Sequence, residues 1–200
     1  VVDQWSAGLE PQPATHHRTR APAPATTDQT MSATEHTPAP NPAAPVDGWH
    51  WEDFTVGMQM SFGPSPVGRE EVIRFAKDFD PQPFHLSEEA GKASLFGGLA
   101  ASGWHTAGIV MRLMCDGFIL NSSSLGSPGL DSLKWLKPVL VGDELRARMT
   151  VLATRPMNSK PKVGLVQTRW EALNQRDEVV MTIESWAMFG RRHPGHPMQL

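Results

Sequence analysis

Residues 102–120 limit the fold more than any other part of this sequence. Apolar and small side chains recur there every three or four residues, which predicts a helix. The first set is Trp104, Ala107, Gly108, Met111, Met114, Cys115 and Phe118, and the opposite side adds Ile109, Val110 and Leu113. A helix that is apolar on most sides must be buried, so the rest of the chain has to wrap around it.

Three segments after this helix alternate apolar and polar residues, as strands with one buried face do. They lie at 144–151, 166–172 and 179–184, and the polar residues 174–177 supply a turn between the last two. A shorter strand is expected at 131–137. One long buried helix with an antiparallel sheet wrapped around it is an α+β domain.

Two prolines, Pro81 and Pro83, divide the segment before the long helix. A strand at 58–62 and a helix at 69–79 are expected before them, and a short helix at 87–92 after them. The prolines themselves are expected to exclude helix.

Residues 1–47 have the composition of a tail. They hold 8 of the 18 prolines and neither Phe nor Ile, so they bury too little apolar surface to offset the entropy of ordering. We therefore expect a disordered Pro/Ala/Thr-rich tail at 1–47, one folded domain at 48–192 and a short C-terminal tail at 193–200.

Charge and cysteine content exclude several classes of function. The tail has five acidic residues and two arginines, whereas the remainder balances 16 basic against 16 acidic residues and offers no basic surface for nucleic acid. No apolar run approaches the roughly 20 residues of a membrane span. The single Cys115 excludes an internal disulfide and a thiolate metal cluster. A cytoplasmic protein without a metal, acting on a small molecule or another protein, is predicted.

The densest group of reactive side chains lies at 78–105. Asp80 and His85 flank a loop stiffened by proline, so both can point at one place and together hold and deprotonate a water. Gly103 is near the N-terminus of the long helix, where free N–H groups suit a carbonyl oxygen that gains negative charge. This combination describes addition to a carbonyl-activated double bond, or the reverse elimination. The alternative is a turn-forming Asp and a packed His, and His105 is expected to be an interior histidine.

Three motifs resemble those of the MaoC-like dehydratases, the group that includes (R)-specific enoyl-CoA hydratases. They are DPQPFH at 80–85, FGGLAASG at 96–103 and KPVLVGDEL at 137–145, and the resemblance extends from about Trp51 to Phe189. It implies a single hot-dog domain, an antiparallel sheet around one long helix, that forms a homodimer with acyl-CoA tunnels near the interface.

The resemblance places Asp80 and His85 on the catalytic pair of the family, and Gly103 on the glycine whose N–H polarises the thioester carbonyl. It implies a hydro-lyase that reversibly hydrates a trans-2-enoyl-CoA, with water attacking C3 and a proton added at C2. No cofactor is implied, because CoA is part of the substrate.

Three positions depart from the family pattern. Gln82 replaces a preferred Asn, Ser87 stands where Asp is frequent, and Met111 replaces a serine of characterised hydratases. Gln82, Trp104 and Met111 are expected to line the substrate pocket, so the departures concern substrate range more than reaction class. The alternatives are a hot-dog acyl-CoA thioesterase and a catalytically silent acyl-CoA-binding domain.

Overall fold

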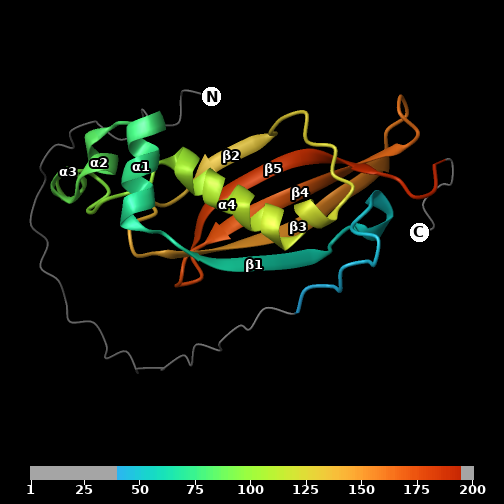
Figure 1. The fold of residues 1–200 in the computed structure, drawn as a ribbon, viewed down its shortest axis with the longest axis horizontal. Helices are drawn as coiled ribbons and strands as arrows, with labels where there is room; N and C mark the ends of the chain where they lie inside the picture. The colour runs from blue at the N-terminus through green and yellow to red at the C-terminus, as the bar shows by residue number, and fades with distance from the viewer. Residues whose placement is uncertain (1–39, 195–200) are drawn as a thin grey trace, which may run out of the picture. The chain divides into compact units, whose positions relative to one another are not determined.

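A five-stranded antiparallel sheet curves around one long helix, α4 (Gly103–Gly117), in the computed structural model, which describes residues 40–194 (Figure 1). The strand order is β1-β3-β4-β5-β2, and every neighbouring pair is antiparallel. The strands are β1 (Gln59–Pro66), β2 (Ser132–Trp135), β3 (Glu144–Pro156), β4 (Val163–Leu173) and β5 (Val179–Gly190). The predicted α+β arrangement is confirmed.

The centre of the sheet is formed by β3, β4 and β5, the segments whose alternation was strongest. Alternate residues of β3 are at most 1% exposed and form part of the core between the sheet and α4; they are Leu145, Ala147, Met149 and Val151. The predicted turn at 174–177 joins β4 to β5, with Asp177 at a positive φ of 59°. Short β2 and the bulged β1 form the two edges.

Three short helices cover one end of the sheet, beside the N-terminus of α4 (Figure 1). They are α1 (Arg69–Phe79), α2 (Pro83–Leu86) and α3 (Glu88–Ala93). The prediction that the prolines exclude helix is wrong for Pro83, which is the first residue of α2. A proline is tolerated there because the first N–H of a helix has no intrahelical acceptor, and its fixed φ suits the helix.

The long helix is shorter than its apolar period predicted. It ends at Gly117, and residues 119–121 form a separate 3₁₀ turn, η2 (Ile119–Asn121). Its burial is also one-sided in the single chain: Ile109 and Val110 face the sheet, whereas Trp104 and Met111 are 59% and 52% exposed. The helix therefore presents an apolar side that residues 40–194 do not cover.

Aromatic rings fill the core at the end away from α1–α3. Phe54 follows the 3₁₀ turn η1 (Trp51–Asp53), is fully buried, and packs its ring 4.6 Å from Phe189 and 6.1 Å from Phe118. Trp51 lies over Gly164 of β4, where a side chain would overlap its indole ring. Burial of a large apolar side chain contributes about 1.5–3 kcal/mol, so this cluster anchors the C-terminal half of the α4 region to the sheet.

Most of the predicted N-terminal tail and the last residues of the C-terminal one lie outside the described residues. Within 40–194, the Asn41 amide exchanges two hydrogen bonds of 2.7 Å with the backbone of Ser61, and Asp47 pairs with Arg192 at 2.7 Å. No helix in this part of the chain is long and apolar enough to cross a membrane.

Candidate functional site

Asp80 and His85 meet where α1 gives way to α2. Asp80 is the residue that ends α1, and the proline at the start of α2 turns the chain so that His85 faces back toward it. His85 Nε2 lies 3.4 Å from Asp80 Oδ2, and the two side chains are 6% and 19% exposed. The structure thus brings the two candidate residues together in a nearly buried position.

The imidazole of His85 has a defined orientation. Its Nδ1 lies 2.7 Å from the carbonyl oxygen of Ala100. A carbonyl oxygen can only accept, so Nδ1 carries the hydrogen and Nε2 is the atom left to exchange a proton. In the neutral ring, Nε2 and the Asp80 carboxylate are both acceptors, so a water molecule can donate one hydrogen to each.

The Asp80 carboxylate receives a hydrogen bond on each oxygen. Gln82 Nε2 donates to Oδ1 at 2.8 Å, and Ser102 Oγ donates to Oδ2 at 2.7 Å. Burial raises the pKa of Asp80, but the hydrogen bonds from Ser102 and Gln82 and the nearby His85 outweigh it and leave the pKa below its ordinary value. Asp80 is therefore held as a carboxylate at neutral pH.

The N-terminus of α4 adjoins this pair. Ser102 is the N-cap residue, and its side chain accepts a hydrogen bond of 3.2 Å from Trp104 N–H. Gly103 is the first residue of the helix, so its N–H has no intrahelical acceptor. The partial positive charge of the helix terminus is thus placed next to the residue that contacts Asp80.

Trp135 of β2 packs directly on Gly103. Its Nε1 donates to the Gly103 carbonyl at 2.9 Å, and a Cβ on Gly103 would lie 2.5 Å from the indole ring. Only glycine allows this approach, because real Cβ contacts are ordinarily at least 3.4 Å. The indole thereby fixes the first turn of α4.

The three residues expected to line the substrate pocket are in different places. Gln82 contacts Asp80, as described above. Trp104 and Met111 lie seven residues apart on the exposed side of α4, and the Trp104 ring meets Trp135 edge to face at 5.4 Å.

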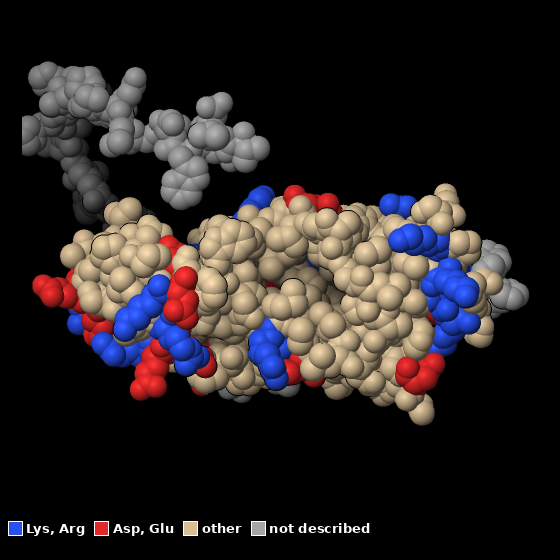
Figure 2. Space-filling model, turned by 45° about the horizontal axis from the view of Figure 1, so that its top comes forward, with Lys and Arg blue, Asp and Glu red and all other residues tan. Residues whose placement is uncertain are grey.

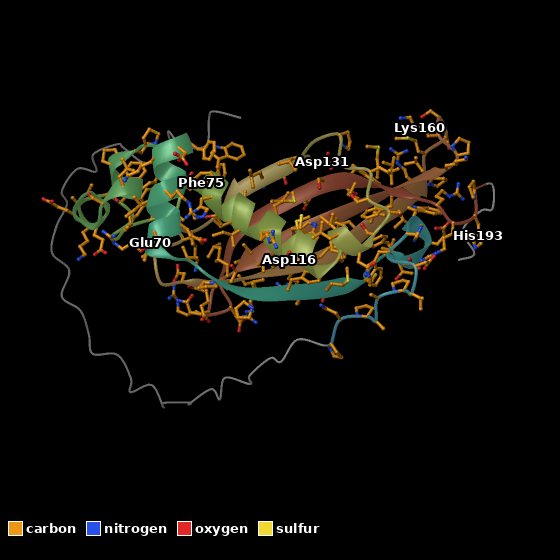
Figure 3. The ribbon with its side chains drawn as sticks, viewed as in Figure 1. Glu70, Phe75, Asp116, Asp131, Lys160 and His193 are labelled. Atoms are coloured by element: carbon orange, nitrogen blue, oxygen red, sulfur yellow. The ribbon has the colours of Figure 1, made fainter. Side chains whose placement is uncertain are left out.

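His105 lies on another side of α4 and is half-buried rather than fully interior. Its ring stacks on Phe75 of α1 at 4.9 Å, and Figure 3 shows Phe75 on the side of α1 toward α4. The Nδ1 atom is buried and has no hydrogen-bond partner among the residues that the structure describes. Burial lowers the pKa of His105, which favours the neutral ring.

Sequence reasoning missed three groups of this site. A serine directly before the first residue of a helix is a recognisable N-cap signal, so Ser102 could have been found as a cap. Its bond to Asp80 and the packing of Trp135 join segments far apart in the sequence. The Ala100 carbonyl is a backbone group, so its contact with His85 cannot be recognised from residue types in the sequence.

The arrangement combines a carboxylate, an imidazole with one free nitrogen, and a helix N-terminus. The first two can bind a water molecule and take its proton, and the third can stabilise negative charge on a carbonyl oxygen. These are the requirements of proton-coupled addition or elimination next to a carbonyl group.

Comparison with known proteins gives one consistent result. Residues 52–174 match the model of the MaoC-like domain family. The crystal structure of a MaoC-like dehydratase from Rhodospirillum rubrum superposes with a TM-score of 0.68 at 42% identity, covering 73% of this chain and 99% of that one. A 3-hydroxybutyryl-CoA dehydratase from Methylorubrum extorquens is 23% identical over 156 residues, which are 76% of this chain and 90% of the relative.

A further structure confirms the fold. A Mycobacterium tuberculosis protein with a double hot-dog fold gives a TM-score of 0.64 at 15% identity, covering 76% of this chain and 47% of that one. The sheet wrapped around α4 is therefore a hot-dog domain, as expected from the sequence.

Proposed function

The chain belongs to the MaoC-like dehydratase family, and from this premise we propose that it adds water reversibly to the C2=C3 double bond of a trans-2-enoyl-CoA thioester. The observation that carries the proposal is the 3.4 Å separation of His85 Nε2 and Asp80 Oδ2 beside the helix turn that begins at Gly103. The dehydratase name of the Methylorubrum relative supports a short acyl-CoA as the substrate class.

In the proposed reaction, a water molecule donates one hydrogen to Asp80 and the other to His85. Its oxygen bonds to C3 while one proton passes to the Asp80–His85 pair, and the π electrons of C2=C3 move through C2 to the thioester oxygen. The N–H of Gly103 stabilises the resulting enolate oxygen. The enolate then collapses as C2 takes a proton from the pair, so the product has gained one hydroxyl group and one hydrogen. No cofactor is required.

The proposal includes a homodimer. One side of α4 exposes Trp104 and Met111. Beside it, β2 exposes Trp135 and is an edge strand of the sheet formed by residues 40–194. Figure 2 shows a largely uncharged area in the middle of the molecule, with charged residues at its two ends and along its upper and lower edges. Pairing with a second copy would cover both the apolar side chains and the edge.

The test is turnover of crotonyl-CoA by the wild type and by Asp80→Asn, His85→Ala and the double variant. Each single change is expected to lower kcat by about 10²- to 10⁴-fold, as removal of a positioned acid–base group does. The double variant is expected to be little worse than either single, because the residues act as a unit. Asp78→Asn, an exposed carboxylate on the same helix, is the matched control and should keep wild-type activity.

Melting temperatures on the same samples separate catalysis from folding. Wild-type turnover in both folded single variants would overturn the proposal. Release of free CoA thiol in place of loss of the enoyl absorbance would show a thioesterase, and neither signal would show a silent acyl-CoA-binding domain.

A further inference from the structure

The segment 100–103 contacts both Asp80 and His85 and includes the first residue of α4. The Ala100 carbonyl holds His85, the Ser102 hydroxyl holds Asp80, and Gly103 is the first residue of α4, whose N–H is the proposed donor to the thioester oxygen. This segment is itself fixed to the rest of the domain, because Ala101 N–H donates to the Val139 carbonyl at 2.8 Å. The segment 100–103 therefore sets the relative positions of the three groups.

The direction of the Ser102 hydroxyl follows from its partners. Trp104 N–H is a donor, so Ser102 Oγ must accept that bond. The single hydroxyl hydrogen is then available for Asp80 Oδ2, the same oxygen that lies nearest to His85 Nε2. Ser102 is 1% exposed, so water cannot replace either bond readily.

The N-cap role of Ser102 explains its bond to Trp104 N–H but does not explain its bond to Asp80. Ser87 caps α3 by accepting a hydrogen bond from Ala90 N–H at 3.2 Å, and it does so at an exposed position. Ser102 performs the same task for α4 and in addition donates to a carboxylate. A hydrogen bond to a charged acceptor is stronger than a neutral one, and its loss removes the hydroxyl donor from Asp80 Oδ2.

We infer that Ser102 is a positioning residue for the hydration reaction: its hydroxyl holds the Asp80 carboxylate facing His85 and ties it to the helix turn that binds the thioester oxygen. The inference rests on the proposed function. Without the hydroxyl, only the Gln82 amide holds the carboxylate, through its other oxygen, and the charged form loses a strong donor. Both effects weaken the binding of the attacking water.

The first experiment compares Ser102→Ala, Ser102→Cys and Ser102→Thr with the wild type. Alanine should lower kcat roughly tenfold or more with little change in KM, because a charged hydrogen bond is lost at the reacting pair. The acid limb of the pH–kcat profile should move to higher pH. Threonine keeps the hydroxyl and should recover most of the activity. Cysteine keeps the shape of serine with a slightly larger atom and a weaker donor, so it reports on the bond even if alanine fails to fold.

Ser87→Ala is the matched control, since it removes an N-cap serine that makes no contact with Asp80. It should alter the melting temperature without altering kcat or the pH profile. In the Asp80→Asn background, Ser102→Ala should cause no further loss of kcat, because Ser102 acts through Asp80. A full loss in that background, or an unchanged pH profile in Ser102→Ala and Ser102→Cys, would overturn the inference.

A carboxyl ¹³C titration by NMR gives a readout that does not need turnover. The Asp80 resonance is identified by its disappearance in Asp80→Asn, and its pKa should rise in Ser102→Ala and stay unchanged in Ser87→Ala. If the wild type fails to hydrate crotonyl-CoA, the proposed function fails, and the titration still decides whether Ser102 controls Asp80. An Asp80 pKa that is the same in Ser102→Ala and the wild type would refute that control.

Discussion

Gly103→Ala tests whether close packing on the first turn of α4 is needed for activity. The new Cβ would lie 2.5 Å from the Trp135 ring, against an ordinary contact of at least 3.4 Å, so the indole or the helix turn must move by about 1 Å. A displacement of about 1 Å at a reacting centre can lower the rate by about 10²-fold. We expect kcat/KM for crotonyl-CoA to fall by that factor.

The effect on stability should be small. Overpacking destabilises by about 1–3 kcal/mol, but alanine is favoured over glycine in a helix by about 1 kcal/mol, and the contact lies at the surface, since Trp135 is 45% exposed. The melting temperature should therefore fall by only a few degrees. Gly108→Ala is the control in the same helix, since a Cβ there meets nothing within 4 Å, and it should leave kcat/KM unchanged.

A double-mutant cycle tests whether contact with Trp135 causes the loss of kcat/KM in Gly103→Ala. Trp135→Ala removes the ring, so adding Gly103→Ala in that background should cause little further loss. Wild-type kcat/KM in Gly103→Ala would refute the reasoning. An equal loss in both backgrounds would also refute it, because the alanine would then act on something other than Trp135.

Three further outcomes are expected. Gly164→Ala should lower the melting temperature by about 5–10 °C, because its Cβ overlaps the buried Trp51 ring, whereas Gly108→Ala, whose Cβ meets nothing within 4 Å, should not; equal effects would contradict this. Hydrogen bonds lower the folded-state pKa of Asp80 below 3.8, so its stabilising contribution is present above about pH 4 and is lost as the pH falls through the lowered value. The melting-temperature difference between wild type and Asp80→Asn should shrink between about pH 5 and pH 2, and a constant difference would count against that linkage. Light scattering should give a mass near twice 22.0 kDa that falls in Trp104→Glu, and a monomeric wild type would exclude the dimer.

Periodicity predicted the central sheet because β3, β4 and β5 each have one buried face along most of their length. The ends of elements were less predictable. The long helix stops at Gly117 although apolar residues continue, because the chain turns there to pack Phe118 into the aromatic core. Pro83 starts a helix because position within a helix, rather than residue type, decides whether proline is tolerated.

The candidate site also has one part that the sequence predicts and one part that it does not. Asp80 and His85 could be proposed from the sequence, since five residues across two prolines limit their separation. The contacts of Ser102 with Asp80 and of Trp135 with Gly103 could not, because they join residues 22 and 32 positions apart in the sequence. Such contacts depend on how the sheet and helices pack, which local patterns do not encode.

The two ends of α4 lie in different surroundings. Its first turn adjoins the proposed catalytic pair, whereas beyond its last turn Phe118 lies among Phe54, Trp170 and Phe189, at the other end of the sheet. Substitutions in that aromatic cluster can change the melting temperature over a wide range while leaving the geometry at Gly103 intact. A search for heat-resistant variants should therefore mutate the aromatic end, and a search for new substrates should mutate the surroundings of the first turn, with little interference between the two libraries.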